Sequence, residues 1–189
     1  MKTLRNDTYP AIDPKQWDMR GRTVAITGAS KGVGRATAIS YAQAGASGIA
    51  LIARSPTDLE ESAKLVRESA LKCGRPEPQI LQLVADTTDE ASVLSAASQV
   101  AAAFHKLDIL VNNAGVLSGW NRIGEADTND WWSNFVVNVK GSYLVTSAFL
   151  PTLIKEPNGL KTIVNVASFG AHLISHGGSG YQVCSRDCT

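Results

Sequence analysis

The chain lacks the features that commit a protein to a membrane, to secretion or to nucleic acid. Among its 189 residues, no apolar run approaches the roughly 20 residues that cross a bilayer. Residues 1–10 contain no apolar stretch of the kind found in a secretory signal. Lys and Arg number 18 against 17 Asp and Glu, so the formal net charge of +1 provides no basic surface for nucleic acid. A cytoplasmic protein with neither membrane nor nucleic-acid partners is expected.

Cysteine is scarce, which excludes a disulfide scaffold. The three cysteines are odd in number, and Cys73 is expected to be a structural or surface thiol. The remaining two belong to a pattern whose spacing is compatible with zinc, formed by His172, His176, Cys184 and Cys188. Because these residues lie in a glycine-rich loop and at the end of the chain, no metal site is predicted. Zinc stays an alternative that metal analysis would test.

An alternation of short β-branched runs with longer helical patterns begins at Thr23. Residues 1–22 are polar, lack hydrophobic periodicity and are interpreted as an N-terminal arm, and residues 23–189 as one domain. The predicted strands are Thr23–Thr27, Gly48–Ala53, Gln79–Val84, Asp108–Asn112 and Lys161–Ala167. The predicted helices lie near 33–45, 57–73, 89–105 and 129–156, with starts marked by Thr57, Thr88 and Thr128.

Several of the predicted strands are apolar throughout rather than alternating, as in Val24–Ile26, Ile49–Ile52 and Ile109–Val111. This pattern is typical of a parallel sheet that helices cover on both faces. Short, right-handed connections then predict a doubly wound, Rossmann-like α/β fold with three α/β/α layers.

Glycines cluster between the first predicted strand and the first predicted helix, in the segment Thr27–Arg35. Glycine allows the backbone to turn tightly and to approach a pyrophosphate, which the helix N-terminus attracts through its N–H groups and partial positive charge. The spacing Gly-x-x-x-Gly-x-Gly differs from the Gly-x-Gly-x-x-Gly dinucleotide fingerprint. The candidate cofactor-binding residues of this loop are Gly28, Ser30, Lys31, Gly32, Val33 and Gly34.

The end of the second predicted strand favours NADP(H) over NAD(H). An acidic residue there would bind the ribose hydroxyls of NAD(H), whereas Arg favours a 2′-phosphate. The chain has Arg54 at this point and no acidic residue before Asp58, and Lys31 adds a second cation. The alternative is that Arg54 is only a solvated charge at the end of a strand.

Together with later motifs, this loop resembles the classical short-chain dehydrogenase/reductase family over residues 23–183. The later cofactor motifs are Asp86 and the run Asn112, Asn113, Ala114, Gly115. The resemblance implies that Asp86 contacts adenine, and that Asn112, Ala114 and Gly115 border the cofactor. For Asp86 a second interpretation stays open, in which it caps the helix that begins near Thr88. The N-terminal arm and the residues of the motifs are similar to those of fungal members of the family, some of which serve secondary metabolism.

The resemblance also implies three catalytic residues, Asn138, Ser168 and Tyr181. In the family, the Asn holds a water in a proton relay, the Ser hydrogen-bonds the substrate carbonyl, and the Tyr is the general acid/base. The implied activity is hydride transfer between NADP(H) and the carbonyl or alcohol of a small organic substrate. For Asn138 the alternative is a helix-bending or solvent-facing amide.

The chain departs from the family after Tyr181. The family has a Lys four residues beyond the Tyr, which lowers the Tyr pKa from about 10, whereas this chain has Ser185. Arg186 would replace the Lys only if the segment were not helical, because one residue turns a helix by about 100°. A remnant that binds dinucleotide without turnover is therefore the alternative function.

The ending of the chain adds further expectations. The change after Val183 suggests a frame, splice or gene-model boundary, and transcript sequencing tests the gene-model version of this hypothesis. The domain is expected to be incomplete beyond the fifth strand, with that strand as an exposed edge and the usual family oligomer interface largely missing.

Overall fold

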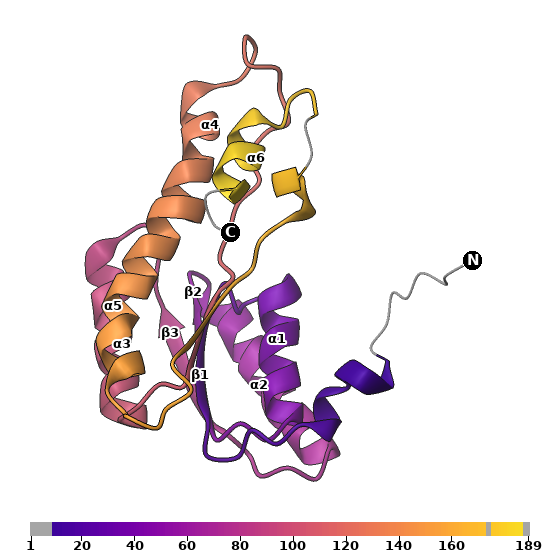
Figure 1. Cartoon of the computed structure of the whole chain (residues 1–189), viewed down its shortest axis with the longest axis vertical. Helices are drawn as coiled ribbons and strands as arrows, with labels where there is room; N and C mark the ends of the chain where they lie inside the picture. Colours follow the sequence, from indigo (N-terminus) through magenta and orange to yellow (C-terminus); the bar gives the residue numbers. More distant parts are fainter. Residues whose placement is uncertain (1–8, 173–174, 187–189) are drawn as a thin grey trace.

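The computed structural model describes residues 9–172 and 175–186 and contains a five-stranded parallel sheet (Figure 1). The strand order is β3-β2-β1-β4-β5. The strands are β1 (Thr23–Thr27), β2 (Gly48–Ala53), β3 (Gln79–Val84), β4 (Ile109–Asn112) and β5 (Thr162–Asn165). The first three match the predicted bounds, and β5 is shorter than predicted. It begins after Lys161, whose φ of 49° lies outside the range of an extended strand.

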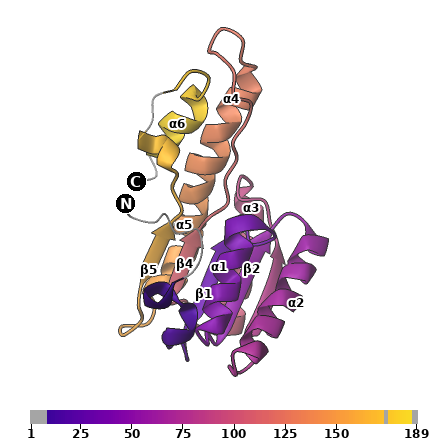
Figure 2. The same cartoon turned by 90° about the vertical axis from the view of Figure 1, so that its right-hand side faces the viewer.

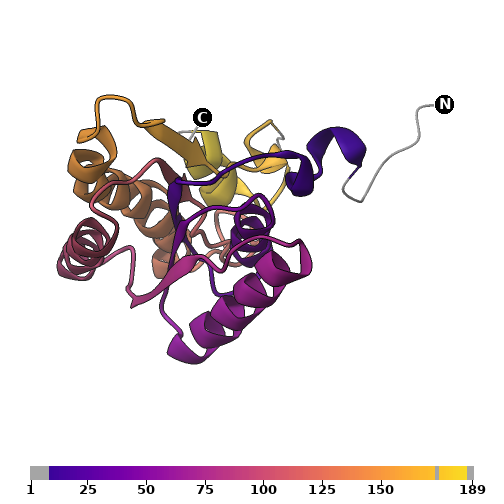
Figure 3. The ribbon, with the colours of Figure 1, turned by 90° about the horizontal axis from the view of Figure 1, so that it is seen from below.

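Helices cover both faces of the sheet, which confirms the predicted three layers. The helices are α1 (Gly32–Gln43), α2 (Pro56–Lys72), α3 (Glu90–Phe104), α4 (Thr128–Phe135), α5 (Ser142–Ile154) and α6 (Ser179–Arg186). Figure 3 shows α1 and α2 on one side of the sheet and α3 and α5 on the other. Each side has its own apolar core, one containing Ile26 and Leu59 and the other containing Leu110 and Phe149.

The strands differ in burial as their places in the sheet require. Every residue of β1 and β2 is buried, in register with Val24 opposite Ile49. The residues of β5 are exposed, and this strand forms one edge of the sheet, as predicted (Figure 2). Continuous apolar sequence therefore corresponds to central strands that are covered on both faces.

The side chains that cap three helices agree only in part with the predicted markers. The predicted markers were Thr57 with Asp58 and Glu60, Thr88 with Asp89 and Glu90, and Thr128 with Asp130. The side chains that accept hydrogen bonds from first-turn N–H groups are Ser55, Asp89 and Asp127. Ser55 is followed by Pro56, whose fixed φ suits the first helical position. Each of these helix starts contains more than one side chain that could cap the helix. The backbone conformation determines which of them accepts the hydrogen bonds of the first turn.

The predicted long helix near 129–156 is interrupted by a π-helical segment. The π-helix η3 (Val136–Gly141) separates α4 from α5, and Asn138 lies within it. A wider turn of this kind often accompanies a functional position in a helix.

Two short 3₁₀-helices, η1 (Pro10–Ile12) and η2 (Pro14–Gln16), precede the sheet, and η4 (Phe169–His172) follows β5. No helix in the described part of the chain is long and apolar enough to cross a membrane.

Candidate functional site

A cleft of about 740 Å³ lies where the parallel strands end. Loops after β1, β2, β3 and β4 and one face of α4 and η3 line it. The predicted cofactor residues that line the cleft are Gly28, Ser30, Lys31, Val33, Arg54, Asp86, Ala114 and Gly115. Ligands of doubly wound sheets bind at this place, because the strand ends and helix N-termini converge there.

The tight backbone path of the glycine loop requires glycine at two of its positions, Gly28 and Gly34. Gly28 has a φ of 65°, in the left-handed region that favours glycine. A Cβ on Gly34 would lie 2.3 Å from the carbonyl oxygen of Gly28, so only glycine fits there. Gly34 therefore does not line the cleft but lets α1 begin close behind the loop.

Lys31, at the cap position of α1, makes no side-chain capping hydrogen bond. The first-turn N–H groups of α1 thus have no acceptor on the cap residue, a condition that suits an anion-binding helix start. This feature and the close approach at Gly34 fit the pyrophosphate of a dinucleotide.

Asn113, which the sequence analysis did not select, joins the β4 end to the glycine loop. Its Nδ2 donates to the carbonyl oxygens of Thr27 (2.9 Å) and Gly28 (3.3 Å). Asn112, which was predicted to border the cofactor, does not line the cleft. Its Nδ2 donates to Thr146 Oγ1 and Asn165 Oδ1, both at 2.9 Å, and so joins β4 to α5 and β5.

Arg54 and Asp86 meet at one end of the cleft. The Arg54 side chain is 80% exposed, and its Nη1 lies 4.0 Å from Asp86 Oδ2. Asp86 Oδ1 accepts hydrogen bonds from the backbone N–H (2.9 Å) and the hydroxyl (2.8 Å) of Thr88. The backbone N–H of Thr88 lowers the pKa of the Asp86 carboxyl against the opposing effect of burial, and the Thr88 hydroxyl and Arg54 lower it further. Since Asp89 caps α3, Asp86 instead closes the turn before that helix.

Asn138 is a buried amide, 9% exposed, so the solvent-facing alternative is excluded. Its Oδ1 accepts from the N–H of Val116 at 2.8 Å, and its Nδ2 donates to the carbonyl oxygen of Val116 at 2.9 Å. The same Nδ2 lies 3.2 Å from Cys184 Sγ. Asn138 therefore ties the loop after β4 to η3 and α6, and whether it also serves a proton relay stays a prediction.

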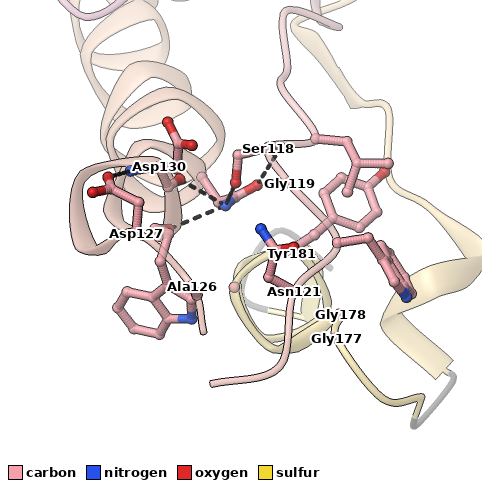
Figure 4. A pocket seen from close by; sticks show the side chains of 14 residues that line it. Ser118, Gly119, Asn121, Ala126, Asp127, Asp130, Gly177, Gly178 and Tyr181 are labelled. Carbon is pink, nitrogen blue, oxygen red and sulfur yellow. Dashed lines mark hydrogen bonds between the residues drawn. The ribbon is translucent and has the colours of Figure 1, made fainter. Parts of the chain in front are cut away.

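The structure brings Ser168 and Tyr181 together around Gly170. A Cβ on Gly170 would lie 3.1 Å from Tyr181 Cε1 and 3.3 Å from Ser168 Oγ. Ser168 Oγ accepts a hydrogen bond from the N–H of Gly170 at 3.1 Å, which turns the chain into η4. Neither residue lines the large cleft. Tyr181 instead lines a cavity of about 10 Å³, room for about one water, together with Ser118 and Gly177 (Figure 4).

Contacts to α4 hold the start of α6, which carries Tyr181. Trp131 Nε1 donates to Ser179 Oγ at 3.1 Å. A Cβ on Gly180 would meet the buried Asn134 at 3.0 Å and Trp131 at 3.1 Å. These contacts join segments about 50 positions apart, so no local sequence pattern predicts them.

Ser185 is buried in α6, at 6% exposure. The helical segment extends to Arg186. The condition for Arg186 to replace a Lys, a segment that is not helical, is not met.

The zinc alternative finds no support in the described residues, where no group of three potential metal ligands occurs. His172 and His176 are exposed, whereas Cys184 is buried and its thiol lies 3.2 Å from the carbonyl oxygen of Tyr181. Cys188 lies outside the described residues.

Comparisons with known proteins agree with this geometry. Residues 22–184 match the family described as short chain dehydrogenase. The short chain dehydrogenase mpl6 of Monascus purpureus is 51% identical over 177 residues, covering 94% of this chain and 59% of that protein. The chain thus spans about three fifths of the length of this relative.

Solved structures of similar architecture hold either nicotinamide cofactor. An NAD⁺-bound xylitol dehydrogenase superposes with a TM-score of 0.78 at 27% identity, covering 89% of this chain and 61% of that one. A putative short chain dehydrogenase from Escherichia coli CFT073, complexed with NADPH, superposes with a TM-score of 0.77 at 28% identity, covering 89% and 67%.

Proposed function

The chain belongs to the short-chain dehydrogenase family, and on that premise we propose that it binds NADP(H) as an oxidoreductase of small carbonyl or alcohol compounds. The observation that carries the proposal is the composition of the cleft. The cleft is lined by the start of α1, where the cap residue makes no side-chain capping hydrogen bond, and by two cationic side chains, Lys31 and Arg54. The helix start suits the pyrophosphate that both nicotinamide cofactors share, whereas the two cations suit the 2′-phosphate that only NADP(H) carries.

The chain's own residues would divide the work as follows. The α1 N-terminus, Gly28 and the loop at Ala114–Gly115 hold the dinucleotide along the strand ends. The Ser168 hydroxyl hydrogen-bonds the substrate oxygen, and the Tyr181 hydroxyl gives a proton to that oxygen or takes one from it. The bound cofactor supplies or accepts the hydride.

A second candidate function is binding of the dinucleotide without turnover, and the buried Ser185 favours it. This position follows Tyr181 by one helical turn and carries no charge. A nearby positive charge favours the phenolate of a tyrosine general base, and a serine at this position supplies no such charge.

Titration calorimetry with NADPH and NADH tests the cofactor proposal. We expect NADPH to bind at least 10-fold more tightly, because a charge-assisted contact is worth about 1.5–3 kcal/mol. Arg54→Ala should weaken NADPH by about 10-fold and NADH by less than twofold. Arg67→Ala is the matched control, since Arg67 pairs with Glu77 outside the cleft. Tighter binding of NADH than of NADPH would contradict the proposal.

A turnover assay then separates the two candidate functions. Reduction of a panel of small ketones and aldehydes, followed by loss of NADPH absorbance, should be abolished by Tyr181→Phe while NADPH affinity stays within twofold. NADPH binding with no turnover in the wild-type chain would favour the second candidate.

A further inference from the structure

The carbonyl oxygen of Ser30 is the acceptor of an unusually dense set of hydrogen bonds. Arg35 donates to it through Nε (2.9 Å) and also through Nη2, and the hydroxyl of Ser62 donates at 3.1 Å. Arg35 belongs to α1 and Ser62 to α2, so the two helices meet at one carbonyl of the glycine loop. Neither Arg35 nor Ser62 lines the cleft.

The guanidinium of Arg35 is shared among several acceptors at once. Besides Ser30, its Nε donates to Ser62 Oγ at 2.9 Å, and its Nη2 lies 3.1 Å from Glu61 Oε2. Ser62 is fully buried, and the Arg35 side chain is only 21% exposed. Only the planar fork of Arg presents this many donors in fixed directions, because a Lys ammonium is a single point of charge.

This arrangement fixes the direction of the next peptide N–H group. The peptide between Ser30 and Lys31 is trans, and in a trans peptide the C=O and N–H bonds point in opposite directions. Because the Ser30 oxygen is held toward α2, the N–H of Lys31 is directed away from Arg35. Ser30 and Lys31 both line the cleft, as do Arg54 and Ser55.

We propose that Arg35, assisted by Ser62, is a positioning residue that sets how strongly the cleft discriminates NADP(H) from NAD(H). The inference rests on the proposed binding of NADP(H), but it assigns part of the specificity to side chains outside the cleft. Arg35 acts by geometry rather than by its charge, because Glu61 pairs with that charge. It holds the Ser30–Lys31 peptide so that the Lys31 side chain can contact the 2′-phosphate of NADP(H) in the cleft.

The test compares three variants by titration calorimetry with NADPH and with NADH, and by thermal unfolding. Arg35→Lys keeps the charge but removes the fork, and should weaken NADPH about 10-fold and NADH less than threefold. Ser62→Ala removes the second donor to Ser30 and should weaken NADPH about threefold, which also covers the case in which Arg35→Lys folds poorly. Arg67→Lys, the same change in the exposed pair with Glu77, should alter neither affinity.

The outcomes distinguish this inference from the proposed function. NADPH affinity that is unchanged in both Arg35→Lys and Ser62→Ala would refute the positioning role alone. Equal losses for NADPH and NADH, with a lowered melting temperature, would reveal a merely structural role and refute it as well. A wild-type chain that binds neither cofactor would refute the proposed function, and the positioning role with it.

Discussion

Replacing Asp108 by Asn should remove a large part of the stability of the sheet. The Asp108 side chain is fully buried at the start of β4, yet it is charged. Its Oδ1 accepts from Arg22 Nη1 at 2.8 Å. Its Oδ2 accepts from the N–H of Thr23 at 3.0 Å and lies 3.3 Å from Lys106 Nζ. The carboxylate thus joins the first residue of β1 to β4 and faces donors on every side.

The magnitude follows from these contacts. The amide of Asn keeps the shape but presents an N–H₂ group to one of the donors and removes the charge that attracts Arg22 and Lys106. Hydrogen bonds to a charged group contribute about 1.5–3 kcal/mol each, and breaking a buried ion pair costs about 3–5 kcal/mol. Both cations are 35% exposed and can be solvated again, so we expect a loss of about 3 kcal/mol in the free energy of unfolding.

The effect should also depend on pH. Burial would raise the pKa of the Asp108 carboxyl, but the hydrogen bonds from Arg22, Thr23 and Lys106 together outweigh burial and lower the pKa below its ordinary value. A depressed pKa contributes stability that is fully present above the unfolded-state pKa of about 3.9 and is lost as pH falls through the folded-state pKa. The difference between wild type and Asp108→Asn should therefore be largest near neutral pH and shrink below about pH 4.

Urea unfolding followed by circular dichroism, at pH 7 and at pH values below 4, measures this difference. Asp18→Asn is the control, because Asp18 pairs with Arg20 on the surface, and its urea midpoint should stay close to that of wild type. A loss below about 1 kcal/mol at pH 7, or a difference that does not change with pH, would show that the buried carboxylate is not stabilising as argued.

Three further changes test the loop, the π-helix and a helix end. Gly34→Ala should raise the dinucleotide Kd at least 10-fold in calorimetry, because its Cβ would lie 2.3 Å from the Gly28 carbonyl oxygen and displace the loop. Asn138→Ala should lower the free energy of unfolding by about 1–2 kcal/mol in urea titration, because the part-buried N–H and C=O of Val116 lose their partners. His105→Gly should raise the urea midpoint, by about 0.5–1 kcal/mol in stability, because His105 ends α3 with a φ of 61°.

Local sequence predicted the strands well and the helix starts less well. The bounds of β1 and β2 follow from continuous apolar runs, which a buried parallel strand requires. The cap of α2 was placed at Thr57 instead of Ser55, because both side chains are capable of capping. The choice depends on which residue keeps an extended backbone beside the first turn, and no residue type specifies that.

The two asparagines at the end of β4 have different roles that the motif alone could not separate. Their adjacency in the sequence suggests one role, but successive side chains of a strand point to opposite faces of the sheet. Asn112 accordingly reaches α5 and β5, whereas Asn113 reaches the glycine loop. The motif predicted where the cofactor site lies. The directions of the Asn112 and Asn113 side chains are known only from the tertiary structure.

The sequence by itself determined the fold class, the order of elements, the glycine loop and the cations near it, because each depends on the character and spacing of neighbouring residues. Only the tertiary structure decided that Asn138 is buried, that Ser168 and Tyr181 meet at Gly170, and that Arg35 and Ser62 hold the Ser30 carbonyl. These contacts join residues far apart in the chain, and their geometry depends on how helices pack against the sheet. Side-chain direction at such contacts is a property of that packing, which no local pattern encodes.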